Sequence, residues 1–86
     1  TPVLLGNYPN PFNPATQIGF SLPAASHVTL VVYNIMGQQV AVLADGQYEA
    51  GDHSVTWDAS AQSSGVYLYL LEVSGFSQTR KMMLLK

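Results

Sequence analysis

The chain has 86 residues, no cysteine and a net charge of −2 at neutral pH. A chain of this length builds a single hydrophobic core, and 48% of its residues are hydrophobic while only 9% are charged. Without cysteine there are no disulfides, thiol nucleophiles or thiolate metal sites. The cations are confined to Arg80, Lys81 and Lys86, which is too little positive charge for a nucleic-acid backbone. We therefore expect one domain over residues 1–86 and no nucleic-acid partner.

The two ends of the chain suggest a fragment of a larger protein. The chain starts Thr1-Pro2-Val3 with no initiator methionine and no pattern of a signal peptide. No stretch has the length and apolar character of a membrane-spanning helix. We expect a piece cut from a longer polypeptide, with Lys86 as the true C-terminus.

Residues 1–14 are rich in proline and asparagine. Three prolines lie between positions 9 and 14, and because proline has no backbone donor this segment does not fit a central strand. Each proline also pushes the residue before it towards extended geometry. We expect residues 1–14 to form a lead-in ribbon at the end or edge of the domain, with Tyr8 and Phe12 plugging the open end of the core.

From residue 15 onward, hydrophobic residues recur with a period of two. Side chains of a strand point to opposite faces in turn, so each alternating set lines one face. The sets expected to face a core are Ile18, Phe20 and Leu22; Val28, Leu30 and Val32; His53, Val55 and Trp57; and Tyr67, Tyr69, Leu71 and Val73.

Turn-forming residues separate these runs at the spacing of a β-sandwich. They are found at Asn34–Gly37, Asp45–Gly46, Ala50–Asp52, Asp58–Gly65 and Ser74–Gly75. No longer window shows helical periodicity, and Ala59–Ser64 accommodates one helical turn at most. The pattern predicts an all-β fold, an antiparallel β-sandwich of about seven strands over residues 15–86.

The side chains that catalysis needs are scarce. The only histidines are His27, expected to be exposed at the start of a strand, and His53, expected to be partly buried. No Gly-x-Ser-x-Gly motif places a nucleophile, and no glycine-rich loop follows a strand to bind phosphate. A catalytic site needs convergent polar groups in a pocket, so we expect no enzyme and no cofactor.

Four carboxylates are the candidates for a structural ion. They fall in different predicted loops and match no calcium-loop spacing: Asp45, Glu49, Asp52 and Asp58. We expect them to cap backbone donors at turns, with a bound ion as the alternative.

Aromatic residues support an alternative function, that of a carbohydrate-binding or structural accessory module in a secreted multidomain protein. Trp57, Tyr67 and Tyr69 fall in the sets that face the core, which leaves Tyr33 and Tyr48 for a surface role. Two separated tyrosines make a weak platform for stacking sugars.

Five segments together carry a resemblance to a known family. They are YPNPFNP at 8–14, VTLVVYNIMGQ at 28–38, AGDHSVTWD at 50–58, SGVY at 64–67 and TRKMMLLK at 79–86. In their order and spacing, over about residues 4–86, they resemble the C-terminal sorting domains, type A, of the type IX secretion system.

The resemblance implies an immunoglobulin-like sandwich that sorts an attached N-terminal cargo domain. It implies passage through the periplasm and across the outer membrane, with the cargo secreted or held at the cell surface. The implied partners are the outer-membrane translocon and a sortase-like protease that removes the domain. A sorting module is therefore the leading hypothesis.

The last strand, Phe76–Lys86, is the element that we expect a translocon to read. Met82–Leu85 is apolar on both faces, so the strand is either central and covered twice or an edge that meets a partner. An edge would be recognised by strand addition, and weakly charged edges also favour a homodimer through an edge or the terminal strand. The expected recognition residues are Gly65, Val66, Tyr67, Arg80, Lys81, Met82, Leu84, Leu85 and Lys86.

Overall fold

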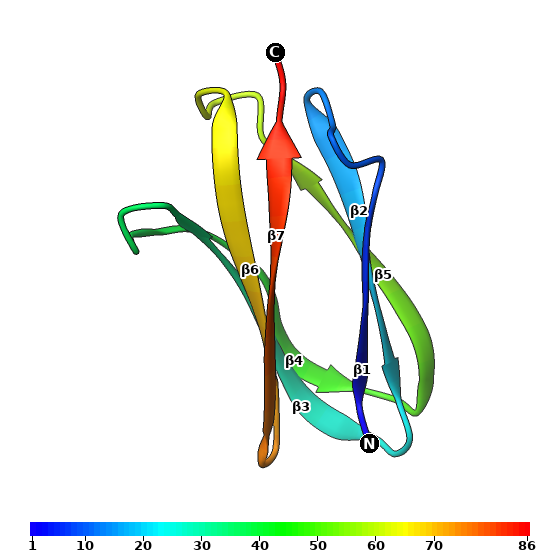
Figure 1. The fold of residues 1–86 in the computed structure, drawn as a ribbon. Coiled ribbons are helices and arrows are strands. Elements are labelled where there is room, and N and C mark those ends of the chain that lie inside the picture. The colour runs from blue at the N-terminus through cyan, green and yellow to red at the C-terminus, as the bar shows by residue number, and fades with distance from the viewer.

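A computed structural model describes all residues, Thr1–Lys86, and contains seven strands and no helix (Figure 1). The strands are β1 (Val3–Tyr8), β2 (Ala15–Leu22), β3 (Ser26–Asn34), β4 (Gln39–Tyr48), β5 (Gly51–Asp58), β6 (Gly65–Val73) and β7 (Phe76–Leu84).

The strands form two antiparallel sheets that pack face to face. One sheet has the order β1-β2-β5 and the other the order β4-β3-β6-β7. In constant-type immunoglobulin domains the fourth strand pairs with the fifth, whereas here β4 pairs with β3 and enlarges the second sheet. The predicted antiparallel β-sandwich of about seven strands is confirmed.

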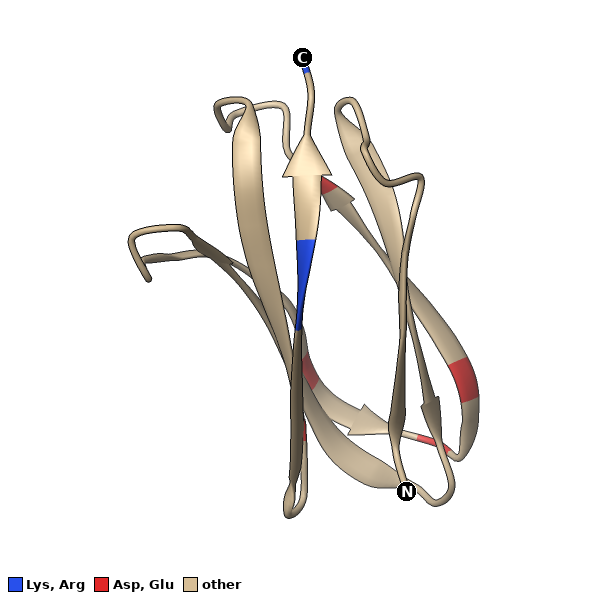
Figure 2. Cartoon of the chain, in the orientation of Figure 1, with Lys and Arg blue, Asp and Glu red and all other residues tan.

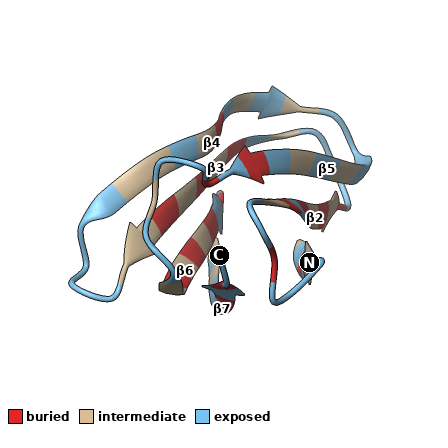
Figure 3. Ribbon diagram, turned by 90° about the horizontal axis from the view of Figure 1, so that it is seen from above, coloured by how far each residue is buried: buried red, intermediate tan, exposed pale blue.

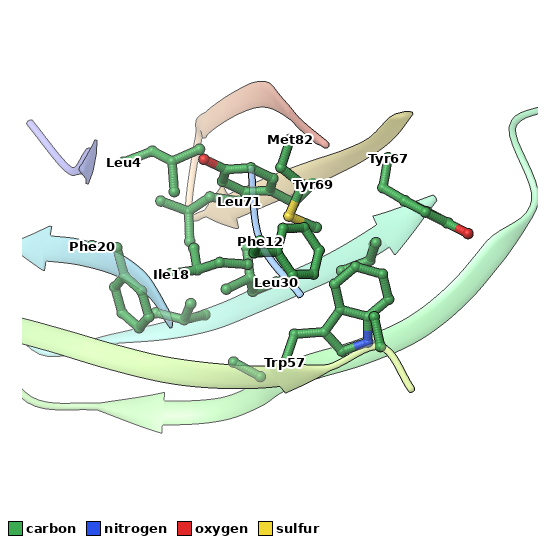
Figure 4. Close-up of a cluster of buried hydrophobic side chains, with 14 of the residues drawn as sticks. Leu4, Phe12, Ile18, Phe20, Leu30, Trp57, Tyr67, Tyr69, Leu71 and Met82 are labelled. Atoms are coloured by element: carbon green, nitrogen blue, oxygen red, sulfur yellow. The ribbon is translucent and has the colours of Figure 1, made fainter. Parts of the chain in front are cut away.

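A single core of 17 buried hydrophobic residues fills the space between the sheets (Figures 3 and 4). The predicted inward sets on β2, β3 and β6 are all buried, and on β5 Trp57 is buried while His53 and Val55 are half-buried. The period of two therefore identified the core-facing side of these four strands, because alternation depends on strand geometry and not on the identity of the partner strand.

Residues 1–14 divide into two parts instead of forming one ribbon. Val3–Tyr8 make the edge strand β1, which pairs with β2 and contributes the fully buried Leu4 to the core. Residues 9–14 then cross to the other sheet, where Phe12 forms a parallel bridge with Leu84 of β7. The proline cluster begins only at position 9, so the residues before it are free to pair.

Of the two aromatic residues of this segment, one is buried and the other is exposed. Phe12 is buried, as expected, and its ring centroid lies 5.8 Å from that of Trp57. The prediction that Tyr8 plugs the core is wrong, since Tyr8 is 83% exposed. Tyr8 pairs with Gln17, which is exposed between two buried neighbours of β2, so both side chains lie on the outer face.

The turn expected at Asp45–Gly46 is wrong, because β4 runs through it. Asp45 and Gly46 pair with residues of β3, and Oδ1 of Asp45 lies 3.0 Å from Nε2 of the exposed His27. The carboxylate therefore hydrogen-bonds a side chain of the neighbouring strand instead of capping a turn. The chain instead reverses at residues 49–50, between β4 and β5, and the first residue of β5, Gly51, has a φ of 121°.

Candidate recognition surface

Strand β7 lies at the edge of the four-stranded sheet, with β6 as its only partner in that sheet. Its side chains alternate between the core and solvent: Met82 and Leu84 are buried, whereas Met83 is 40% exposed. Leu85, just beyond the strand, is 51% exposed. Of the two arrangements that the sequence leaves open for this strand, the structure shows the edge.

The C-terminal half of this edge is covered by residues 9–14. The backbone N–H of Phe12 donates to the carbonyl of Met83, and the N–H of Leu85 donates to the carbonyl of Phe12, both at 3.0 Å. The N–H of Met83 donates to Oδ1 of Asn10 at 3.1 Å. The backbone groups of β7 that point away from β6 are thus paired from Met83 onward.

The N-terminal half of the edge is open. In an antiparallel ladder, alternate residues direct both their N–H and their C=O away from the partner strand. The backbone N–H and C=O of Met83 point away from β6, so those of Lys81 and Thr79, two and four residues earlier, point the same way. None of the hydrogen bonds outside the ladders involves Thr79 or Lys81. Ser77–Lys81 therefore present unpaired backbone groups along one side of the domain.

Two cations lie on this open edge, on opposite faces of the sheet. Arg80 pairs with the buried Tyr69 and lies on the core-facing side, whereas Lys81 pairs with Leu68 on the outer side. Neither cation has an acidic partner, since the only close contact between a basic and an acidic side chain joins His27 to Asp45. Figure 2 shows this basic stretch midway along β7, with the acidic residues on other parts of the ribbon.

The structure brings the two predicted groups of recognition residues together. Gly65, Val66 and Tyr67 pair with Leu84, Met83 and Met82. The ring of Tyr67 lies edge-on to Trp57 with centroids 5.3 Å apart, and its hydroxyl donates to the carbonyl of Ser63 at 2.7 Å. Tyr67 therefore supports β7 from within the sandwich.

On the outer face, a shallow hollow lies beside this pair of strands. It has a volume of about 300 Å³ and is lined by Asn10, Pro11, Val66, Lys81, Met82 and Met83. The hollow joins the covered half of the edge to the open half, so a partner on β7 would find apolar contact next to Lys81.

Lys86 lies apart from the other two cations. Its backbone N–H donates to Oγ of Ser64 at 2.9 Å, and its ammonium group donates to the carbonyl of Ser60 at 2.6 Å. The pKa of the exposed Asp58 is lowered, first by a hydrogen bond from the Ser60 hydroxyl, then by the Ser60 backbone N–H, and more weakly by the charge of Lys86. Lys86 thus closes the loop between β5 and β6.

The aromatic residues do not assemble a sugar-stacking platform. Trp57 faces the core, as expected. The surface role expected for Tyr48 is not supported, because its ring packs edge-on against Phe20 at 5.4 Å and His53 at 5.1 Å between centroids. Tyr33 is half-buried, and Tyr8 is the one aromatic residue that is mostly exposed.

The carboxylates and histidines do not gather at one place either. No three of the His, Asp and Glu side chains lie close enough together to hold a metal ion. Asp58 accepts a hydrogen bond from the backbone N–H of Ser60 at 3.0 Å, which is the capping role expected of a carboxylate at a turn. The structure also contains no helix that could cross a membrane.

Sequence reasoning missed Asn10 and Thr79 as parts of this surface. Asn10 lies in a proline-rich segment, and nothing in its neighbours indicates that its side-chain oxygen would accept a hydrogen bond from β7. The sequence does indicate on which face Arg80 lies. Residues 80, 82 and 84 alternate with their neighbours, which places Arg80 on the core-facing side of the strand together with Met82 and Leu84.

A small β-sandwich whose last strand is a basic, half-open edge has the form of a module that is recognised by another protein. The chain matches the family model for the secretion system C-terminal sorting domain over residues 7–85, and it belongs to that family. No curated protein matches the chain.

Membership of this family confirms the sorting function expected from the sequence. Domains of this kind are the sorting signals of the type IX secretion system, and they mark proteins for export across the outer membrane to the cell surface or beyond. They are attached to an N-terminal cargo and interact with the secretion machinery. As a kind, these tails are not catalysts.

Proposed function

We propose that the outer-membrane translocon recognises this domain by adding a strand to the open edge of β7. The observation that carries the proposal is the row of backbone groups at Ser77–Lys81, which point away from β6 and have no partner in the chain. An exposed edge of this kind is a template for β-augmentation, in which main-chain hydrogen bonds supply affinity and side chains supply specificity.

The predicted recognition residues fall into two groups: those placed to contact a partner and those that hold β7 in position. Arg80 and Lys81 lie on the open edge, and Leu85 with Met83 offers apolar contact beyond it. Met82 and Leu84 anchor β7 in the core, while Gly65–Tyr67 hold it through the β6 ladder. Lys86 fixes the end of the chain to the loop between β5 and β6.

We further propose that a sortase-like protease removes the domain after export, and that no catalysis resides in this chain. A cut on the N-terminal side of Val3 leaves all seven strands and the core intact. The edge also admits a homodimer, but two copies of β7 would bring four cations together, which disfavours the pairing. An unlike partner therefore suits this edge better than a second copy.

The test is an export assay with the chain fused behind a periplasmic reporter in a bacterium that has a type IX system. Deletion of Arg80–Lys86 abolishes export, but it also removes core residues, so a milder change is needed. Thr79→Pro removes one outward N–H and no bond to β6, and proline is tolerated at such edge positions. Thr79→Val keeps the N–H and is the matched control.

We expect Thr79→Pro to reduce surface reporter at least tenfold and Thr79→Val to leave it unchanged. Thermal melting of the two purified domains checks that both are folded. Export of Thr79→Pro at the level of the parent chain would rule out strand addition at this edge.

A further inference from the structure

We propose that the strand added to β7 carries an acidic residue, whose carboxylate enters a cleft between β1 and β7 and pairs with Arg80. The inference rests on the proposed function and defines the chemistry of the partner. The edge strands β1 and β7 of the two sheets run next to each other on the open side of the sandwich (Figure 1). The cleft is lined by residues of both strands.

The cleft is large enough for part of an extended peptide. Its volume is about 540 Å³, within the range of roughly 300–1,000 Å³ that is usual for ligand sites. Gly6 and Asn7 of β1 form one wall, Thr79 and Arg80 of β7 form the other, and Tyr69 lies between them. The lining is mainly polar, which suits a charged group better than an apolar one.

Arg80 reaches across this cleft without finding a partner. One of its terminal nitrogens lies 4.0 Å from the place that a Cβ on Gly6 would occupy. A guanidinium group has five N–H donors, yet the side chain of Arg80 makes no hydrogen bond and no ion pair in the structure.

The side chain of Asn7, which also lines the cleft, is hydrogen-bonded to other residues of the chain. Oδ1 of Asn7 accepts a hydrogen bond from the hydroxyl of Tyr69 at 3.0 Å, and the Asn7 amide donates to Oγ1 of Thr16 at 3.1 Å. The five acidic residues of the chain, Asp45, Glu49, Asp52, Asp58 and Glu72, do not line the cleft. The cleft is therefore cationic, and the chain itself does not neutralise it.

The register of an added strand places a carboxylate there. Directly opposite residues of paired strands have Cβ atoms about 4.5–5.5 Å apart on the same face. A residue opposite Arg80 would thus point into the cleft, while its two neighbours would point to the outer face beside Thr79 and Lys81. Aspartate or glutamate at that position forms a charge-assisted, bidentate pair with the guanidinium.

The covered half of the edge sets the length of the strand. Asn10 and Phe12 occupy the backbone groups of β7 from Met83 onward. This leaves Ser77–Lys81, so the partner segment pairs over about five residues with its acidic residue near the C-terminal end of the open stretch. A second copy of this chain fits less well, because its β7 carries arginine and lysine at the same place.

Two five-residue peptides test the charge requirement: acetyl-Thr-Glu-Val-Thr-Val-amide, whose glutamate lies opposite Arg80 when the peptide pairs antiparallel with Ser77–Lys81, and the same peptide with glutamine in place of glutamate. Each is titrated into the ¹⁵N-labelled chain and followed by NMR. We expect the glutamate peptide to shift the amides of Gly6 and Thr79–Met82 and to bind at least tenfold more tightly than the glutamine peptide. High salt narrows this difference.

Variants of the chain assign the effect to one cation. Arg80→Gln abolishes the preference for the glutamate peptide, whereas Lys86→Gln, which changes a cation outside the cleft, preserves it. Arg80→Lys keeps the charge but loses the planar fork, so it retains only part of the preference. Equal binding of the two peptides to the parent chain, or the same shifts with inorganic phosphate alone, would overturn the inference.

An export assay distinguishes failure of this inference from failure of the proposed function on which it rests. If Thr79→Pro and Arg80→Gln both fail in export while remaining folded, both proposals are supported. If Thr79→Pro is not exported and Arg80→Gln is exported normally, strand addition to β7 is supported and an acidic residue opposite Arg80 is contradicted. If Thr79→Pro is exported normally, recognition of this edge is wrong, whatever the peptides show.

Discussion

The hydroxyl of Tyr69 on β6 donates a 3.0 Å hydrogen bond to the side-chain oxygen of Asn7 on β1, and it joins the two sheets across the open side of the sandwich. The bond is one link in a chain, because Asn7 donates to Thr16 and the hydroxyl of Thr16 donates to the carbonyl of Pro9 at 2.8 Å. No buried side-chain polar atom in the structure lacks a partner. This network ties β1 to β6 and fixes the wall of the cleft that Asn7 forms.

Replacing Tyr69 by phenylalanine removes that link. The ring stays in the core, but Oδ1 of Asn7 loses its donor, so we expect a loss of about 1–2 kcal/mol in the free energy of unfolding. Urea denaturation measures it. Tyr33→Phe is the control: Tyr33 is half-buried and its hydroxyl makes no hydrogen bond to the chain, so its free energy of unfolding should match that of the parent. Equal stability of all three chains would contradict a structural role for the bond.

Tyr69 also predicts how stability depends on alkaline pH. Burial raises the pKa of its phenol above the ordinary value of 10.0, with the charge of Arg80 opposing the shift. The folded state thus holds this proton more tightly than the unfolded state. The resulting stabilisation is present below pH 10 and is lost as the pH rises towards the folded-state pKa.

The measurement is the free energy of unfolding between pH 9 and pH 11.5, compared for the parent chain and Tyr69→Phe. The parent should lose more stability over this interval than the variant. If the two chains lose stability in parallel, the phenol of Tyr69 is not protected by folding.

Phe12→Ala tests the residue that closes the core and covers β7. Its side chain is fully buried next to Trp57, and truncating a buried phenylalanine costs about 3–5 kcal/mol. The free energy of unfolding should fall by that amount, and the fluorescence of Trp57 should shift to the red as water enters. Tyr8→Ala, four residues earlier and exposed, should change stability by less than about 0.5 kcal/mol.

The inward faces of β2, β3, β5 and β6 were predictable because they depend on alternation alone. The parity of Val28, Leu30 and Val32 determines which side chains are buried whichever strand lies alongside. Tyr8 was mispredicted because its exposure depends on pairing with Gln17 at a sheet edge, which is a tertiary fact. The role of a polar residue in a short motif that is typical of turns is equally hard to predict from the sequence.

Asp45–Gly46 shows this ambiguity, and Lys86 shows a second limit. Aspartate followed by glycine is typical of turns, yet here the aspartate pairs with His27 across two strands. Lys86 binds the backbone carbonyl of Ser60, and every residue has a carbonyl, so no sequence pattern marks this contact. The edge itself was foreseen as one of two alternatives, while its division into covered and open halves depends on Asn10 and Phe12.

Asp58 predicts an acid-sensitive closure of the loop between β5 and β6. Its pKa is lowered from 3.8, mainly by the hydrogen bond from the Ser60 hydroxyl and next by the Ser60 backbone N–H, with Lys86 contributing least. Because the folded-state pKa is depressed, the stabilisation is present above the unfolded-state value and is lost as the pH falls through the folded-state value. The affected window lies below pH 4.

Titration of the side-chain carboxyl carbon of Asp58 by NMR ranks these causes. Ser60→Ala should raise the Asp58 pKa more than Lys86→Gln does, because the hydroxyl bond is the larger influence and the Lys86 charge is screened by solvent at this exposed site. Asp58→Asn should flatten the loss of melting temperature below pH 4 compared with the parent chain. A larger effect from Lys86→Gln than from Ser60→Ala would mean that the terminal lysine, and not the serine, holds this carboxylate in its charged form.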